Sequence, residues 1–186
     1  STPRSPVALW AEEPRLAATL RAWVHGGGAL IGVGQPSAQQ FQGRFFQLAD
    51  VLGVDEERHQ TLSVDKYFPA VTPEHFITAD VHLGEGVLQG FLDAGYRKPL
   101  SGCGGGQVIG ELGGIDFGEP IANTFPVNED VTLLRADGGQ VQLAVNEYGK
   151  GHSVYFAGLP YSPQNCRILL RAIYYAAGMP EEMKHY

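Results

Sequence analysis

The chain has 186 residues, of which 44% are hydrophobic, and its formal net charge is -7. This length suits one domain with a core of its own, and the acidic balance argues against a nucleic-acid partner, because basic side chains are what neutralise phosphates. Two cysteines are too few for a disulfide framework and favour a cytoplasmic protein, and no apolar run approaches the roughly 20 residues that span a bilayer.

Residues 1–13 are interpreted as a lead-in or a truncated linker, and residues 14–186 as a single α/β domain. The sequence opens without an initiator methionine and enters a helix almost at once. An α/β sheet usually begins with a strand, so we expect this chain to be a fragment of a longer enzyme.

The stretch from Trp23 to Ser37 predicts the centre of the domain. A helix over 14–25, with proline at its first position, ends at the glycines 26–28. The strand 29–33 that follows is uniformly apolar, so we expect it to be buried on both faces at the centre of a mostly parallel sheet. Ser37 then forms a capping box with Gln40, which predicts a second helix over 38–52.

Two motifs in this stretch resemble functional signatures without their context. The segment HGGG at 25–28 matches the oxyanion motif of some esterases, but it follows a helix, and no GxSxG occurs in the chain. The segment GVGQPS at 32–37 lacks the third glycine of a dinucleotide fingerprint, and its proline removes a donor amide. Helix termination and a tight turn explain both, and we expect no cofactor.

The middle of the chain offers weak site candidates. Residues 61–64 suggest a short strand. His75, Asp80 and His82 match no metal-ligand spacing, so we expect solvated side chains and no metal. The glycine-rich loop around Cys103 leads into a strand rather than a helix, which disfavours phosphate binding.

The C-terminal part is the most regular. Residues 131–145 predict a hairpin with a turn at Asp137, and 154–157 predict a further strand. A helix over 163–177 completes the domain. Its predicted buried stripe consists of Cys166, Leu169, Leu170, Ile173 and Ala177. These elements predict a three-layer domain with the helices 14–25, 38–52 and 163–177 on the faces of the sheet, and with the hairpin added as antiparallel strands.

Several strings resemble the lacto-N-biose/galacto-N-biose phosphorylases, glycoside hydrolase family 112. They are WVHGGGALIGVGQPSA (23–38), FQGRFFQLADVLGVDEE (41–57), LSVDKYFP (62–69), EHFITAD (74–80), GIDFGEPIANTFPVNEDVTLLRADGGQVQLA (114–144) and GLPYSPQNCRILL (158–170). The resemblance covers most of the chain from about residue 14 and is to the middle domain of such an enzyme. It implies a class I glutamine-amidotransferase-like (flavodoxin-like) fold.

The resemblance also implies what the parent does. Such an enzyme cleaves Gal-β-1,3-GlcNAc or Gal-β-1,3-GalNAc with phosphate to galactose 1-phosphate. Its catalytic acid belongs to an N-terminal (β/α)8 barrel, which needs about 250 residues and is not in this sequence. The implied partners are that barrel, a C-terminal domain and, as an open alternative, a second copy. No catalytic residue carries over, and the turn at 34–37 holds no cysteine for amidotransferase chemistry.

We therefore expect a non-catalytic middle domain of a phosphorylase, inactive by itself. The alternatives are a stand-alone carbohydrate-binding or scaffolding module, and a small amidotransferase-like hydrolase that uses Cys103 or Ser37. Asp116 and Glu119 lie close in sequence but in a turn context, so they do not predict a catalytic pair.

Ligands of open α/β sheets gather at the carboxyl ends of parallel strands. If the domain touches ligand, this rule predicts contact through five residues. They are Gln35 and Ser37 in the turn after the strand 29–33, and Asp65, Lys66 and Tyr67, which offer a charge pair and an aromatic face.

Overall fold

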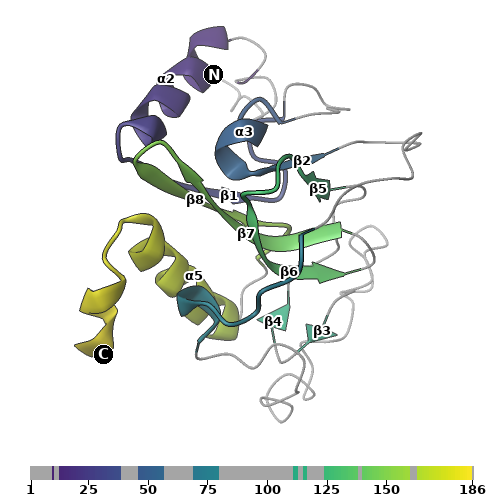
Figure 1. Ribbon diagram of the computed structural model, residues 1–186, viewed down its shortest axis with the longest axis vertical. Helices are drawn as coiled ribbons and strands as arrows, with labels where there is room; N and C mark the ends of the chain where they lie inside the picture. The colour runs from purple at the N-terminus through teal and green to yellow at the C-terminus, as the bar shows by residue number, and fades with distance from the viewer. Residues whose placement is uncertain are drawn as a thin grey trace, which may run out of the picture.

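The computed structural model describes residues 10, 13–38, 46–56, 69–79, 111–112, 115–116, 124–137, 140–159 and 163–185. Its centre is a four-stranded sheet in the order β1-β8-β7-β6 (Figure 1). These strands are β1 (Ala29–Val33), β8 (Gly151–Phe156), β7 (Gln140–Tyr148) and β6 (Thr132–Asp137). The pairing of β1 with β8 is parallel, and the other two pairings are antiparallel.

Helices cover both faces of this sheet, so the domain has three layers (Figure 1). The helices α2 (Pro14–His25) and α3 (Ala49–Leu52) pack on one face. The helix α5 (Pro163–Ala176) and the short 3₁₀ helix η1 (Phe76–Thr78) pack on the other. The remaining elements are the paired strands β2 (Val54–Glu56) and β5 (Thr124–Pro126), the paired strands β3 (Glu111–Leu112) and β4 (Ile115–Asp116), and the 3₁₀ helix η2 (Pro180–His185).

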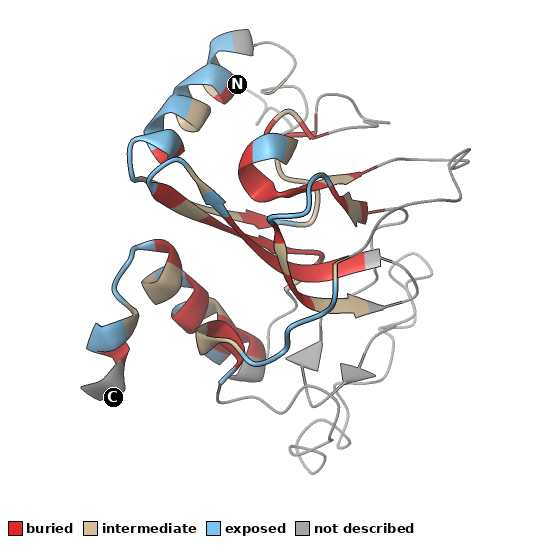
Figure 2. Ribbon diagram, in the orientation of Figure 1, coloured by how far each residue is buried: buried red, intermediate tan, exposed pale blue. Residues whose placement is uncertain are grey.

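Strand alternation divides the core between the two faces. In β8, Tyr155 belongs to the cluster under α2 and α3, whereas Val154 and Phe156 belong to the cluster under α5. In β7, Ala144 belongs to the cluster under α2 and α3, and Val145 belongs to the cluster under α5. Successive side chains of a strand point to opposite faces, so the two central strands supply both cores and are buried along most of their length (Figure 2).

Several predicted elements are confirmed. The first helix has the predicted bounds, 14–25, with proline at its start, and the last runs over 163–176 instead of 163–177. The hairpin predicted over 131–145 is formed by β6 and β7, and the strand predicted at 154–157 overlaps β8. All of these rested on local signals, namely proline, glycine and strict alternation.

The prediction that residues 29–33 lie at the centre of a mostly parallel sheet is wrong. In the described part of the chain β1 is an edge strand, only Gly32 in it is fully buried, and Val33 is 44% exposed. The strands β8 and β7 occupy the centre of the sheet. The reason is that β7 pairs with the edge of β8 opposite β1, and β6 pairs with β7. Among the strands that the structure describes, one of the three pairings in this sheet is parallel.

The predicted helix over 38–52 is also wrong. Ala38 forms an antiparallel bridge with Phe46, and helix begins only at Ala49. The backbone N–H of Phe46 donates a 2.7 Å hydrogen bond to Asp55 Oδ1, which ties the chain before α3 to β2. The apolar periodicity had suggested one long helix. Leu48 and Leu52 are indeed buried, but the segment that contains them is not a continuous helix.

The buried stripe predicted for the last helix faces the wrong way. Cys166, Leu170, Ile173 and Ala177 are exposed, and Leu169 is partly buried. The side chains that pack on the sheet are Ile168, Ala172 and Ala176. The helix carries two apolar stripes, and packing on the sheet buries the one that contains Ile168, with Leu169 packed partly buried beside it.

Other predictions lie outside the described residues. They concern the strand at 61–64, the residues Asp80 and His82, the loop around Cys103, and Glu119. Among the residues that the structure describes, no helix combines the length and hydrophobicity needed to cross a bilayer.

Candidate functional site

The predicted site begins where the parallel pair β1 and β8 ends. Gly34 follows β1, takes a φ of 71°, and donates its N–H to the carbonyl oxygen of Phe156 at 2.9 Å. This bond holds the end of β1 against the end of β8. The turn at residues 34–37 therefore leaves the sheet from the edge at which ligands of α/β proteins gather.

Gln35 is held by a buried carboxylate. Its side-chain Nε2 donates a 2.9 Å hydrogen bond to Oε1 of Glu56, which lies on β2 and is only 1% exposed. The phenol of Tyr155 lies in the same cluster and donates to the carbonyl oxygen of Gly34 at 3.3 Å. Burial and the Glu56 carboxylate raise the pKa of Tyr155 well above its usual range, so its phenol stays protonated and acts as a donor.

Ser37 is a scaffold residue in this structure. It is 1% exposed and takes a φ of 65°, an uncommon backbone conformation for a residue with a side chain. Its Oγ accepts the N–H of Leu48 at 3.1 Å, and its carbonyl accepts the N–H of Gln47 at 3.1 Å. The prediction that Ser37 caps a helix at residue 38 is thus replaced by a longer-range contact with the residue that precedes α3.

The structure brings two of the five predicted site residues together and leaves three undescribed. Gln35 and Ser37 share one turn, whereas Asp65, Lys66 and Tyr67 lie outside the described residues. Sequence reasoning missed Glu56 and Tyr155. The signal for Glu56 was weak, because it stands in an acidic run that reads as solvated surface, and only the pairing of β2 with β5 buries it.

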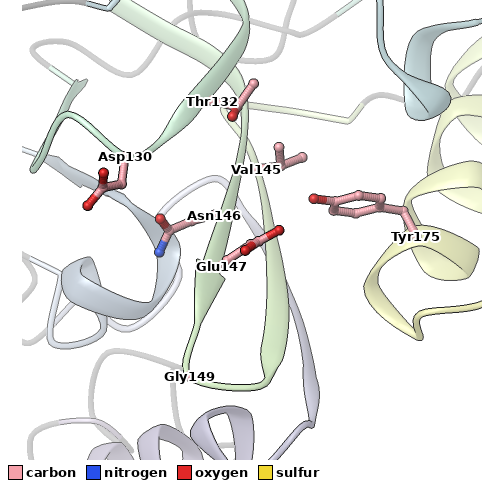
Figure 3. Close-up of a pocket in the computed structure, with 7 residues that line it drawn as sticks. All are labelled: Asp130, Thr132, Val145, Asn146, Glu147, Gly149 and Tyr175. Carbon is pink, nitrogen blue, oxygen red and sulfur yellow. The ribbon is translucent and has the colours of Figure 1, made fainter.

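A second candidate is a polar cleft beside the far end of β7 (Figure 3). Its volume is about 550 Å³, and it is lined by Asp130, Thr132, Val145, Asn146, Glu147, Gly149 and Tyr175. The pairing of β6 with β7 begins at Thr132 and Val145, so β7 continues for three residues beyond β6. The cleft lies over this open edge and receives Tyr175 from α5.

Aromatic and titratable groups surround Tyr175, which lines this cleft. The ring of Tyr175 packs edge-on against His75 at 4.7 Å and against His152 at 5.4 Å between centroids. Burial, followed by the nearby carboxylate of Glu147, raises the pKa of Tyr175. Burial lowers the pKa of His75, and its Nδ1 accepts the N–H of Ile77 at 3.2 Å. His75 therefore caps η1 as a neutral side chain, rather than lying solvated in a loop as predicted.

The polar side chains of this cleft are suited to accept hydrogen bonds. The carboxylates of Asp130 and Glu147 suit hydroxyl or cationic groups, while the amide nitrogen of Asn146 already donates to the carbonyl oxygens of Asp50 and Val51. Across the described residues, no group of three or more His, Cys, Asp or Glu side chains could hold a metal ion.

Comparison with known proteins gives one consistent family. A family model described as lacto-N-biose phosphorylase central domain matches residues 2–181. The chain is 69% identical over 166 residues to 1,3-beta-galactosyl-N-acetylhexosamine phosphorylase from Bifidobacterium longum subsp. longum, covering 88% of this chain and 22% of that protein. It is 39% identical over 179 residues to a protein of the same name from Lachnoclostridium phytofermentans, covering 96% of this chain and 20% of that protein.

A more distant relative has a different name. The chain is 24% identical over 167 residues to D-galactosyl-beta-1->4-L-rhamnose phosphorylase from Lachnoclostridium phytofermentans, covering 90% of this chain and 18% of that protein. The chain thus spans about a fifth of the length of the curated relatives it matches.

Proposed function

Because the chain belongs to the family of lacto-N-biose phosphorylase central domains, we propose that it serves as the non-catalytic middle domain of a longer 1,3-β-galactosyl-N-acetylhexosamine phosphorylase. The longer enzyme would cleave Gal-β-1,3-GlcNAc or Gal-β-1,3-GalNAc with phosphate and release galactose 1-phosphate. The observation that carries this proposal is the 69% identity to a phosphorylase of that name, over 88% of the chain.

The geometry of the candidate site supports an architectural role. Gln35 is committed to Glu56, and Ser37 is committed to the backbone of Leu48. A glycosidase-type reaction needs two carboxyl groups that flank the scissile bond. Of the pair weighed from sequence, Asp116 belongs to β4, where it pairs with Glu111 of β3, and Glu119 lies outside the described residues.

The finer features of the proposal come from the resemblance of the sequence to glycoside hydrolase family 112. We propose that the architecture is the class I glutamine-amidotransferase-like (flavodoxin-like) one, with Ser37 in the turn where an amidotransferase would carry its cysteine. A parallel strand pair with helices on both faces of the sheet supports this assignment. The partners would be an N-terminal (β/α)8 barrel that supplies the catalytic acid, a C-terminal domain and a second copy of the enzyme, in the cytoplasm.

Mutagenesis can test directly whether this site is architectural or contacts ligand. Gln35→Ala and Tyr67→Ala would be made in the full-length polypeptide, and kcat/KM for phosphorolysis would be measured together with the melting temperature. For an architectural turn, Gln35→Ala lowers the melting temperature, because loss of its hydrogen bond to buried Glu56 costs about 1–3 kcal/mol. The same variant leaves kcat/KM within about twofold of wild type, since a twofold change is only about 0.4 kcal/mol.

Tyr67→Ala separates the two roles. An unchanged kcat/KM in both variants supports the architectural role. A tenfold or larger loss of kcat/KM in Tyr67→Ala with an unchanged melting temperature would instead place ligand at Tyr67. A full-length polypeptide without phosphorolytic activity would reject the proposed function as a whole.

A further inference from the structure

The last long helix, α5, is apolar on two sides. One side packs on the sheet through Ile168, Ala172 and Ala176. The other side is exposed, and we call it the outer stripe; it consists of Cys166, Leu170, Ile173 and Ala177. Leu170 is 45% exposed and Ile173 is 47% exposed, so exposed and buried residues share this helix (Figure 2).

The spacing of the outer stripe is that of a helix-packing seam. Its members are separated by four, three and four residues, which places them on one side of a helix. This alternation is the pattern by which the ridges of one helix pack against another helix. Single exposed apolar side chains are normal on a protein surface, but a continuous stripe of them on one helix marks an interaction site.

We propose that the outer stripe of α5 is the surface on which an apolar helix from another domain of the same polypeptide packs. This inference rests on the proposed function, because it requires a longer chain. The family is one of central domains, and the chain makes up only 22% of the Bifidobacterium relative, so most of such a polypeptide lies outside the domain described here.

A second copy fits this surface less well than a covalently joined domain. A stable interface between separate proteins buries roughly 1,200–2,000 Å² in total, more than one stripe of four residues offers. A domain joined through the chain meets its partner at an effective concentration in the millimolar range, so a smaller apolar contact suffices. The side chains of the stripe carry no charge, and the complementary face must therefore be aliphatic or aromatic.

Cys166 provides a direct probe, because its thiol is exposed within the outer stripe. The experiment uses the full-length polypeptide carrying Cys103→Ser and measures the rate at which iodoacetamide labels Cys166, resolved by peptide mass spectrometry. Ala18→Cys, at an exposed position on α2, supplies the reference rate. Each labelling rate is divided by the rate of the same cysteine in urea, where the protein is unfolded. If a helix packs on the stripe, this ratio is at least tenfold lower for Cys166 than for the reference cysteine.

Substitution within the stripe tests whether apolar packing causes the protection. Ile173→Glu is expected to raise the labelling rate of Cys166 at least fivefold, because it places a charge in the seam. Ala22→Glu adds the same charge at an exposed position of α2 and leaves the rate unchanged. If Ile173→Glu unfolds the protein, the inference is tested by the labelling rates of Cys166 and Ala18→Cys in the polypeptide without Ile173→Glu.

The outcomes separate this inference from the proposed function. Labelling of Cys166 at the reference rate in an active phosphorylase overturns the inference and leaves the function standing. Protection that disappears on dilution, together with dissociation of a dimer, shows that a second copy covers the stripe and likewise overturns it. Absence of phosphorolysis in the full-length protein rejects the function, whatever the labelling shows.

Discussion

At the scale of single residues, Asn146 of β7 connects the sheet to a helix end. It is 4% exposed, and its Nδ2 donates to the carbonyl oxygens of Asp50 and Val51 at 3.2 and 2.9 Å. These carbonyls stand at the C-terminal end of α3, where a helix leaves acceptors without partners of its own. The hydroxyl of Ser153 on β8 also donates to Val51, so two neighbouring strands hold this helix end.

Replacing Asn146 with alanine should lower the free energy of unfolding by about 2 kcal/mol, because it removes the donor from two buried carbonyl groups. Urea denaturation of the 186-residue chain measures this change. Glu129→Ala, at an exposed position, is the control and is expected to stay within about 0.5 kcal/mol of wild type. Equal stability of the two variants would show that Asn146 does not hold α3.

At the scale of elements, the close approach of β8 to the end of α2 depends on one glycine. A Cβ at Gly151 would lie 2.2 Å from the carbonyl oxygens of Gly28 and Val24. Both obstacles are backbone atoms, so they cannot give way as the end of a flexible side chain could. Gly151 also begins β8, the strand that pairs with both β1 and β7.

Gly151→Ala is therefore expected to destabilise the domain by about 3 kcal/mol, at the upper end of the range for overpacking. Gly178→Ala is the matched control, since Gly178 follows α5 with a φ of 72° and a Cβ added there would meet open space. That variant should lose about 1 kcal/mol, the cost of a left-handed backbone for alanine. Thermal unfolding of both variants measures the difference, and equal melting temperatures would contradict the proposed clash.

At the scale of the whole molecule, polar contacts join the described helices on each face of the sheet. Arg21 of α2 binds Asp50 of α3 through an ion pair of 2.7 Å, and a further bond from Arg21 reaches the carbonyl oxygen of Gln47. Arg171 of α5 donates to the carbonyl oxygen of Phe76 in η1 at 2.6 Å. These contacts fix α2 to α3 on one face of the sheet and α5 to η1 on the other.

The purified 186-residue chain should accordingly release no galactose 1-phosphate from Gal-β-1,3-GlcNAc and inorganic phosphate. The physical reason is that such cleavage needs an acid carboxyl group held beside the glycosidic oxygen, and the proposed function places this group in another domain. A coupled assay for galactose 1-phosphate provides the measurement, with the full-length polypeptide as the positive control. Turnover by the chain alone would contradict a non-catalytic domain.

The sequence by itself determined the elements whose signals are local. Pro14 and the glycines 26–28 define α2, because proline suits a first helical position and glycine a helix end. Strict alternation in residues 140–143 defines one strand of the hairpin. The strings that resemble a phosphorylase domain identified the family, which the family match over residues 2–181 confirms.

The tertiary structure decided what depends on contacts between distant segments. Strand order is one case, because local periodicity does not say whether β1 or β8 occupies the middle of the sheet. The orientation of α5 is another, because a helix with two apolar stripes can bury either, and contact with the sheet made the choice. The cluster of Gln35, Glu56 and Tyr155 is a third, since three segments far apart in sequence bury a carboxylate only when the sheet brings them together.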